Sequence, residues 1–285
     1  MVIATKKRRD GFGAEIHGFD VEAASDGEIA ALRNLLLEHE VIFIKGCNVL
    51  GPQAYRTFSE RFWGSLVHPF SSTEDPIVPG ISPFQPYEGF PEITGIYHGK
   101  NNKGNLNEWH SDLNWLANPS FGSILQAVEV PAYGGDTLWA STTRAFDDMP
   151  VALKSRCEGR AAFHDFTQIY RGIFKDNHAA LAEAQRRFPA IRHPIFMTHP
   201  KTGRTTVFVN RVSTTHIDEM ALDESRAILE EVYRWVSKPE FQVRHTWEQG
   251  DIAIWDNLAT QHYAISDYFP QERKMHRISL RGVEV

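Results

Sequence analysis

Short runs of apolar, β-branched and aromatic residues recur along the chain, and each is bounded by Gly, Pro or Asn. Val41–Ile44 is the clearest, because all four residues are apolar and Gly46 follows closely. Runs of this length with this punctuation predict β-strands. Short strands that do not alternate with helices predict a mainly β fold with peripheral helices, of the sandwich or jelly-roll type. Further strands are predicted at residues 124–130, 205–209, 252–255 and 277–281.

Three helices are predicted from apolar stripes at helical spacing. Ser25 and Glu28 form a capping box before the first stripe. Pro52 stands where it can open a second helix. Asp223 is expected to cap a third. We expect all three helices to pack on the core; the apolar face of the third carries Ile228, Leu229, Val232 and Trp235.

Composition narrows the class of protein. The 285 residues are expected to form a single domain, 1–285, with residues 1–12 flexible. A formal charge of −6 argues against nucleic acid as the partner. No apolar run approaches the roughly 18 residues of a membrane span, and the N-terminus lacks the apolar segment of a signal peptide. Cys47 and Cys157 could form one disulfide, but so few cysteines favour a reducing, cytoplasmic location.

A candidate metal site comes from two segments that lie far apart in the sequence. Side chains two apart on a strand share a face, so His110 and Asp112 can bind one ion together. His262 follows the predicted strand 252–255 and can supply a third ligand. Two histidines and a carboxylate are the ligand set of non-haem Fe(II) oxygenases, which leaves coordination positions open.

The same spacing occurs a second time, in His216 and Asp218. Among 13 histidines, about one His-x-Asp match is expected by chance. We interpret this second match as a loop pair, able to form its own hydrogen bond. Taken alone, neither His-x-Asp pair is specific evidence for a metal site.

The surrounding motifs are far more specific together. From about Gly13 to the C-terminus, the chain strongly resembles the taurine dioxygenase (TauD/TfdA) family of Fe(II)/2-oxoglutarate-dependent dioxygenases. The motifs that carry this resemblance occur in the family's order and near its spacing. They are Trp109–Asp112, Gly134–Trp139, Asp251–Asn257, Gln261–Ala264 and Met275–Arg277.

The resemblance implies a double-stranded β-helix, a cupin-like jelly roll, with His110, Asp112 and His262 as iron ligands. It implies Fe(II), 2-oxoglutarate and O₂ as cofactor and cosubstrates, with succinate and CO₂ as products. Halogenases of this fold lack the carboxylate ligand. The presence of Asp112 therefore favours hydroxylation or a related oxidation.

The resemblance also implies the 2-oxoglutarate site. Thr137 and Arg273 are expected to bind the distal carboxylate, and Trp139 and Arg277 to line the same region. Arg suits a carboxylate because it donates two parallel hydrogen bonds. In residues 277–281 polar and apolar side chains alternate, so Arg277, Ser279 and Arg281 should share one face. The alternative for both Arg273 and Arg277 is a solvated edge strand.

The substrate site is expected to hold an anion. His68 aligns with a histidine that helps to bind the sulfonate in the taurine enzyme, and Arg277 lies close to the primary substrate in the family. Phe166 matches an aromatic pocket residue, and Leu113 follows the iron-binding Asp where the family has a small aliphatic residue. The alternative for His68 is a hydrogen-bonded loop histidine.

Two departures argue against taurine itself. Ser71 and Ser213 stand where the taurine enzyme has Tyr and Phe, so the pocket should be wider. We therefore predict a larger anionic small molecule, which can be an alkyl sulfate, a longer sulfonate or a carboxylate.

Other functions stay open at this point. One alternative is a dioxygenase of secondary metabolism that acts on an amino-acid-derived carboxylate. A second is a Zn-type hydrolase with a metal-bound water, and a third is a jelly-roll binding module without catalysis. Family members are commonly dimers or tetramers, so a homo-oligomer is expected, without nucleic acid or membrane partners.

Overall fold

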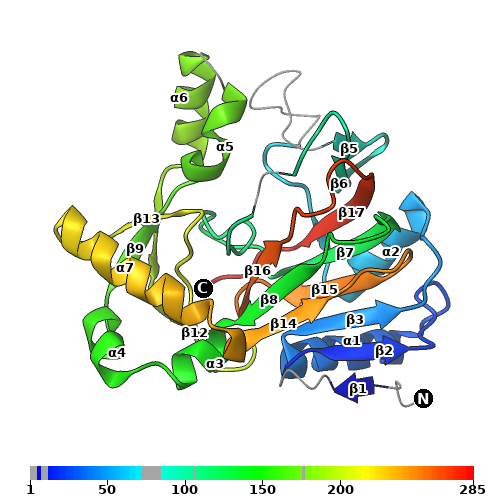
Figure 1. The fold of residues 1–285 in the computed structure, drawn as a ribbon, viewed down its shortest axis with the longest axis horizontal. Helices are drawn as coiled ribbons and strands as arrows, with labels where there is room; N and C mark the ends of the chain where they lie inside the picture. Colours follow the sequence, from blue (N-terminus) through cyan, green and yellow to red (C-terminus); the bar gives the residue numbers. More distant parts are fainter. Residues whose placement is uncertain (1–4, 8–11, 72–84, 105–106, 175–176) are drawn as a thin grey trace.

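A nine-stranded sheet dominates the structure, a computed structural model that describes residues 5–7, 12–71, 85–104, 107–174 and 177–285 (Figure 1). Its strands pair antiparallel, apart from the parallel pair β2 and β3. In spatial order they are β1 (Thr5–Lys7), β2 (Ala14–His17), β3 (Val41–Lys45), β15 (Ile252–Asp256), β7 (Gly122–Glu129), β17 (Arg273–Leu280), β6 (Phe90–His98) and β5 (Gln85–Tyr87), with β4 (Ser65–Leu66) on β17.

A three-stranded sheet of β14 (Gln242–His245), β8 (Thr137–Ser141) and β16 (Thr260–Ala264) packs against the main sheet. Trp139 of β8 joins the two. Its ring lies 5.7 Å from that of Trp255 on β15 and 5.3 Å from that of Phe43 on β3, measured between centroids. All three side chains are fully buried. This aromatic layer fixes the spacing between the sheets, and β16 carries His262.

Two helices cover the other face of the main sheet. The buried residues of α1 (Asp26–His39) and α2 (Pro52–Phe62) form one core cluster with Ile42, Ile44, Ile252 and Ile254 of β3 and β15. Along these strands, alternate residues therefore face either the helices or the second sheet.

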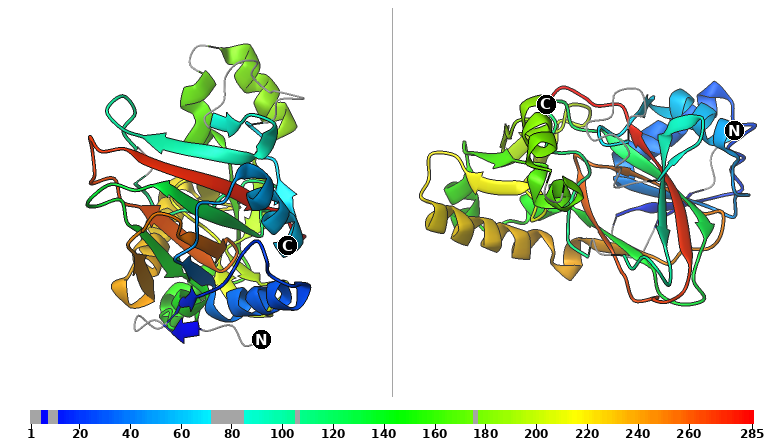
Figure 2. Two further views of the ribbon diagram at one scale, coloured as in Figure 1. Left: turned by 90° about the vertical axis from the view of Figure 1, so that its right-hand side faces the viewer. Right: turned by 90° about the horizontal axis from the view of Figure 1, so that it is seen from above.

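The remaining elements form a second body of structure, which Figure 2 shows beside the sheets in the view from above. There α7 (Leu222–Val236) packs with α3 (Thr142–Asp147) and α4 (Val151–Cys157), and η1 (Pro239–Phe241) follows α7. One small sheet contains β10 (Ile191–Pro194), β9 (Ala161–His164) and β13 (Thr214–Ile217), and another contains β11 (Phe196–Thr198) and β12 (Thr205–Val207). The pair α5 (Thr167–Phe174) and α6 (His178–Arg187) stands at the top of Figure 1.

The predicted elements are largely confirmed. Ser25 caps α1 through the full capping box, and Pro52 opens α2. The prediction for Asp223 is wrong, because α7 begins at Leu222 without a side-chain cap and Asp223 lies in its first turn. Arg277 and Ser279 share a buried face, whereas Arg281 follows β17 and is exposed.

The expected fold is confirmed at the level of extensive sheet with helices around it. The described residues form four separate sheets and no closed barrel, and α3 to α6 were not predicted. Thr5–Lys7 pairs with β2 instead of fraying, while most of the predicted flexible segment lies outside the described residues. Among the described helices, none has the length and apolar character that crossing a membrane requires. Cys47 and Cys157 are free thiols.

Candidate active site

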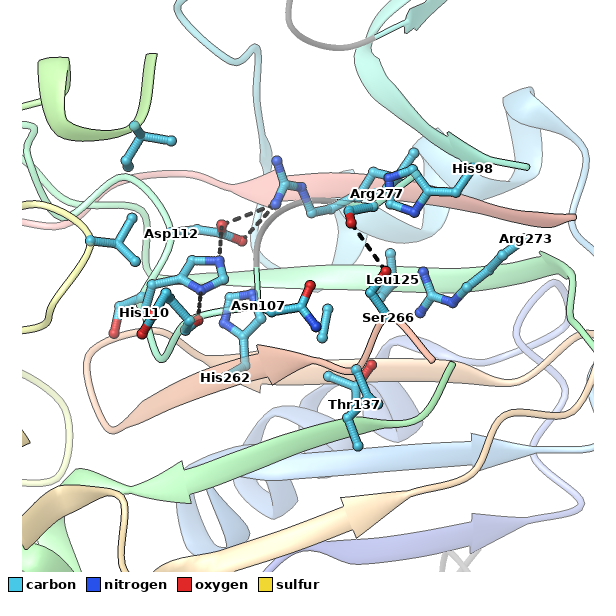
Figure 3. A pocket seen from close by; sticks show the side chains of 18 of the residues that line it. His98, Asn107, His110, Asp112, Leu125, Thr137, His262, Ser266, Arg273 and Arg277 are labelled. Atoms are coloured by element: carbon cyan, nitrogen blue, oxygen red, sulfur yellow. Dashed lines mark hydrogen bonds and ion pairs between the residues drawn. The ribbon is translucent and has the colours of Figure 1, made fainter. Parts of the chain in front are cut away.

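His110, Asp112 and His262 converge at one point between the sheets (Figure 3). One potential ligand atom from each lies within 4.8 Å of the others, and all three side chains are at least nine-tenths buried. Backbone pairing brings the two histidines together. His110 and His262 form an isolated antiparallel bridge, with N–H···O distances of 3.1 and 2.7 Å. The second histidine is therefore set opposite the first by strand register.

The imidazole of His110 is oriented for metal binding. Its Nδ1 lies 2.8 Å from the carbonyl oxygen of Glu108, to which it must donate, because a carbonyl oxygen only accepts. In the neutral ring this leaves the lone pair on Nε2, which faces Asp112 at 3.8 Å. A backbone acceptor on the outer nitrogen is the usual support for a metal-bound histidine.

The charges at this site suit a cation. Burial lowers the pKa of His110, and burial together with His110 lowers the pKa of His262 to about 3, so both rings are neutral and can act as ligands. Burial works to raise the pKa of Asp112, but Arg277 and the two histidines hold it below its usual value. Asp112 accepts hydrogen bonds from Ser123 Oγ and from Arg277 Nη1, each at 3.0 Å. The donor set of two neutral imidazoles and one ionised carboxylate fits Fe(II).

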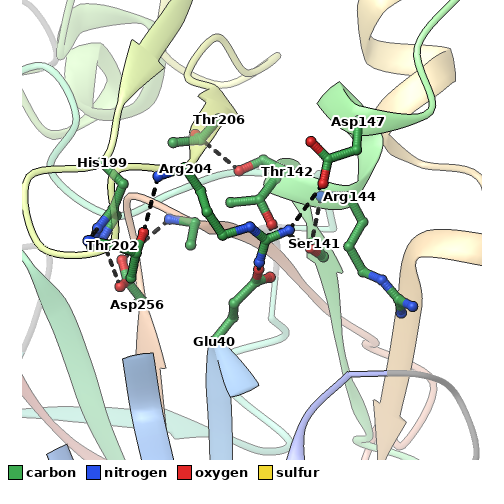
Figure 4. A network of polar contacts seen from close by, with 12 residues as sticks. Glu40, Ser141, Thr142, Arg144, Asp147, His199, Thr202, Arg204, Thr206 and Asp256 are labelled. Carbon is green, nitrogen blue, oxygen red and sulfur yellow. Dashed lines mark hydrogen bonds and ion pairs between the residues drawn. The ribbon is translucent and has the colours of Figure 1, made fainter. Parts of the chain in front are cut away.

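A second polar network holds the turn that leads to His262 (Figure 4). His199 Nε2 lies 2.9 Å from a carboxylate oxygen of Asp256, and the other oxygen accepts the N–H of Leu258 at 2.8 Å. Thr260 Oγ1 donates to the carbonyl of Asp256 at 2.7 Å. Nearby, the buried carboxylate of Glu40 binds Arg204 at 2.7 Å. The bonds of Asp256 fix the connection between β15 and β16 and thus help to fix the position of His262.

A cavity of about 680 Å³ opens beside the three candidate ligands. Arg273 and Thr137 line one end of it, to the right of the candidate ligands in Figure 3. Arg273 is 4% exposed, and within the described parts of the chain no carboxylate lies at ion-pair distance from its guanidinium. Thr137 Oγ1 accepts a hydrogen bond from the indole of Trp247 at 3.0 Å, so its own hydrogen points to another acceptor. A buried cation beside such a hydroxyl can receive a carboxylate.

The other end of the cavity is partly apolar. Its wall includes Leu113, Ile169, Ile173 and Val212. Leu113 adopts a left-handed backbone conformation, with φ of 56°, directly after Asp112. Such a conformation is unusual for a non-glycine residue and turns the chain sharply behind the candidate ligand.

Several side chains expected at the site lie behind its wall. Trp139 is not among the described residues that line the cavity, because its indole forms the core between the sheets. Phe166 lies in an aromatic cluster with Phe70 and Trp115. Ser213 donates to Asn114 at 2.6 Å within a buried polar group. Neither Ser71 nor Ser213 is among the described residues that line the cavity, so the wider pocket inferred from them stays a prediction.

His68 is also buried behind the wall, where it contacts Tyr170. Tyr170, Ile169, Ile173, Arg211 and Val212 line the cavity but were not predicted. No helix was predicted at residues 167–174, and the sequence of so short a helix does not reveal which of its side chains will face a cavity. The second His-x-Asp pair does not form a site, because Asp218 binds Arg192 at 2.6 Å and His216 binds Thr215.

Comparison with known proteins decides the family. Residues 4–279 match the "Taurine catabolism dioxygenase TauD, TfdA family". The chain belongs to this family. The expected resemblance is therefore confirmed, and the TauD/TfdA protein described here is an oxidoreductase that uses Fe(II), 2-oxoglutarate and O₂.

Two relatives of this TauD/TfdA protein are similar over nearly its whole length. An alkylsulfatase from Acinetobacter baylyi is 31% identical over 95% of this chain and 82% of its own. An "alpha-ketoglutarate-dependent sulfate ester dioxygenase" from Pseudomonas putida is 31% identical over 95% of this chain and 86% of its own. Among solved structures, a taurine dioxygenase from Burkholderia xenovorans aligns with a TM-score of 0.78 and 30% identity, over 98% of this chain and 89% of that one.

Proposed function

We propose that this protein oxidises alkyl sulfate esters with Fe(II), 2-oxoglutarate and O₂. The observation that carries the proposal is the cavity itself, in which the cation of Arg277 lies beside Asp112 while Leu113, Ile169, Ile173 and Val212 supply an apolar wall. An anionic head with an alkyl tail matches that arrangement. The two relatives whose names refer to sulfate esters support it further.

In this proposal His110, Asp112 and His262 hold the iron. Arg273 binds the distal carboxylate of 2-oxoglutarate and Thr137 donates to it. Bound Fe(II), with 2-oxoglutarate and O₂, supplies the oxidising power for C–H hydroxylation. The protein orients the substrate, and the buried walls exclude water from the reacting carbon.

The proposed overall reaction balances. One alkyl sulfate, one 2-oxoglutarate and one O₂ give an aldehyde, hydrogen sulfate, succinate and CO₂. One oxygen atom enters succinate, and the other enters the carbon that bears the ester oxygen. The resulting hemiacetal-like ester then loses hydrogen sulfate as its C–O bond to the sulfate breaks. Arg277 is the cation placed to hold the sulfate group through both stages.

Several finer features belong to the same proposal. We propose that residues 1–285 form one domain in which the nine-stranded sheet and the sheet of β14, β8 and β16 are the walls of a double-stranded β-helix, supported by the likeness to the taurine dioxygenase structure. The two free thiols support a cytoplasmic location. A homodimer or tetramer is proposed on family grounds alone.

A turnover screen tests the substrate. Purified enzyme with Fe(II) and 2-oxoglutarate is offered hexyl sulfate, hexanesulfonate, hexanoate, phenoxyacetate and taurine, and succinate is measured. We expect hexyl sulfate to give the highest kcat/KM, with aldehyde and sulfate formed in equal amounts to succinate. Turnover of a carboxylate with none of hexyl sulfate would overturn the sulfate ester proposal.

A second measurement tests the metal roles. Fe(II) and 2-oxoglutarate are added without O₂, and a weak visible charge-transfer absorption is expected in the wild type and not in His110→Ala. A colourless wild-type complex that nevertheless hydrolyses sulfate esters would favour the Zn-type hydrolase instead. Family membership argues against that outcome and against a non-catalytic binding module.

A further inference from the structure

A cluster of buried polar side chains lies behind the apolar wall of the cavity. Its members come from three distant parts of the chain, and each is at most 1% exposed. They are Asn114, His164, Asn210 and Ser213, named here the Ser213 cluster. None of the four is among the described residues that line the cavity. Polar groups are costly to bury unless they are paired, so the hydrogen bonds of this cluster show what it holds in place.

Ser213 connects two of these parts of the chain. Its hydroxyl donates to Oδ1 of Asn114 at 2.6 Å, and Nδ2 of Asn114 lies 3.2 Å from Nδ1 of His164. An amide N–H can only donate, so Nδ1 of His164 accepts. Burial lowers the pKa of His164 to about 3, so the ring is neutral and one nitrogen is free to accept. These bonds join residue 114 to the end of β9.

Asn210 holds the turn that carries Val212 to the cavity. Its Oδ1 accepts the backbone N–H groups of Val212 at 3.0 Å and of Ser213 at 3.1 Å. Its own backbone N–H donates to Oγ1 of Thr214 at 3.0 Å. A side-chain oxygen that accepts from the backbone two residues further on forms a turn that Asn favours. The place of Val212 in the cavity wall depends on this turn.

The same cluster holds the start of α5. The carbonyl oxygen of Ser213 accepts the N–H of Asp165 at 2.9 Å. The carboxylate of Asp165 in turn accepts the N–H of Thr167, the first residue of α5, at 2.7 Å. Further along the helix, Ile169 and Ile173 line the cavity. The helix that supplies much of the apolar wall is therefore anchored at Ser213.

Leu113 completes the wall on the side of the candidate iron ligands. It lines the cavity and has a left-handed backbone with φ of 56°. Such a conformation is costly for a non-glycine residue, so surrounding contacts must hold it. Asn114, the next residue, supplies one of these contacts through its bond to Ser213. The three segments of the apolar wall, at residues 113, 169–173 and 212, are thus connected through one cluster.

We propose that the Ser213 cluster determines which alkyl tails the enzyme accepts, because it holds Leu113, Val212 and the start of α5 in fixed relative positions. Its members act as positioning residues from behind the cavity wall. The inference rests on the proposed function, since it requires a substrate whose apolar tail lies along this wall. It gives Ser213 a role that differs from the substrate contact expected from the sequence.

Selectivity between tail lengths tests the inference. Ser213→Ala removes the donor to Asn114 and keeps the backbone bonds of residue 213. The readout is the ratio of kcat/KM for octyl sulfate to kcat/KM for ethyl sulfate, from succinate and aldehyde formation. Loss of a hydrogen bond between neutral groups corresponds to about a 2- to 10-fold change in an equilibrium constant. We expect the ratio to fall about 3- to 10-fold, while KM for 2-oxoglutarate and the iron content keep their wild-type values.

Ser120→Ala is the matched control. Ser120 is also fully buried, and its hydroxyl lies 2.8 and 2.9 Å from the carbonyl oxygens of Gly122 and Leu280, outside the described lining of the cavity. Denaturant unfolding should show that both variants lose stability, whereas only Ser213→Ala changes the ratio. An unchanged ratio in Ser213→Ala, or an equal fall in Ser120→Ala, overturns the inference.

A double-mutant cycle tests whether Ser213 and Asn114 act as one unit. Asn114→Ala should lower the ratio as well, and adding Ser213→Ala to it should change the ratio by less than about twofold. Independent, multiplicative effects would overturn the inference. If Asn114→Ala does not fold, the comparison of Ser213→Ala with Ser120→Ala decides.

The design also separates this inference from the sulfate ester proposal. If the wild type converts octanesulfonate or octanoate but not octyl sulfate, the substrate class is wrong, and the ratio is measured in the series that is converted. A fall of that ratio in Ser213→Ala then supports the inference without the sulfate ester. A wild type that converts octyl and ethyl sulfate equally well overturns the inference and leaves the sulfate ester proposal standing. If the wild type converts none of the three classes of anion, both proposals fail.

Discussion

The two ends of the cavity are built in different ways. The candidate iron ligands and the expected 2-oxoglutarate anchors, Thr137 and Arg273, lie on or beside paired strands. The wall that faces the substrate comes from α5 and from loop residues such as Val212. At the first end, backbone hydrogen bonds fix the positions, and at the second, side-chain contacts do. The difference suggests that the reaction type is set by strand register and the substrate by residues that can vary without disturbing a sheet.

The largest effect is expected from Asp112→Ala. This change removes a proposed metal ligand and also the carboxylate to which Arg277 donates. Fe(II) binding and turnover should be lost, and breaking a buried ion pair should lower the free energy of unfolding by about 3–5 kcal/mol. Metal analysis, succinate release and denaturant unfolding measure these. Asp218→Ala, in the other His-x-Asp pair, is the control, and wild-type iron content in Asp112→Ala would refute the assignment.

A smaller, selective effect is expected from Arg273→Lys. Lysine keeps the charge but loses the paired donors that fit a carboxylate. KM for 2-oxoglutarate should rise about 10- to 100-fold, while Kd for hexyl sulfate changes little. Arg244→Lys, which alters an ion pair of 2.6 Å with Asp136, serves as the control. Equal changes for both ligands would mean that the two ends of the cavity are not separate.

The effect of a change in the apolar wall should depend on the length of the substrate's alkyl tail. Ile173→Ala removes apolar surface from the cavity, so binding of octyl sulfate should weaken by roughly 5- to 30-fold. Ethyl sulfate, whose tail is too short to reach far along the wall, should be affected much less. Val151→Ala, at a 79% exposed position, is the control. The same loss for both esters would show that Ile173 does not contact the tail.

The smallest effect is expected at the cavity mouth. Arg211 lines the cavity and forms ion pairs with Glu230 at 2.5 Å and Glu108 at 3.6 Å. Glu230→Gln should cost about 0.2–1 kcal/mol of stability, because the pair is partly exposed. It should also raise the association rate of anionic substrates modestly at low salt. Stopped-flow binding at two salt concentrations measures this, with Glu231→Gln, which pairs with Arg156, as the control.

The parts of the fold and the site that could be predicted from sequence are those determined by neighbouring residues or by two motifs recognised together. The capping box of α1, the apolar strand β3 and the convergence of His110 with His262 belong to this group. The wall of the cavity that faces the substrate could not be predicted in this way. Tyr170 lines the cavity while α5 packs on Phe70 and Trp115, and the apolar spacing within this eight-residue helix does not tell which of its side chains will face a cavity.

Alignment with the family did not predict which neighbours three of the site residues would contact. Phe166 and Ser213 were expected at the substrate, and in the structure Phe166 packs in an aromatic cluster and Ser213 donates to Asn114, both outside the described lining of the cavity. Trp139 was expected beside 2-oxoglutarate but fills the space between the two sheets. In each case the residue type was compatible with either place. The choice depends on neighbours that come from distant parts of the chain.

The bridge between His110 and His262 has a consequence for how the protein can change over time. One inserted or deleted residue in the turn 257–259 would shift β16 by one position and carry the imidazole of His262 to the opposite face. The enzyme would lose its metal without losing a single ligand residue. Length changes are therefore expected to be excluded from residues 256–262 and tolerated in the connections around α5 and α6, where new substrate preferences can arise by lengthening the chain.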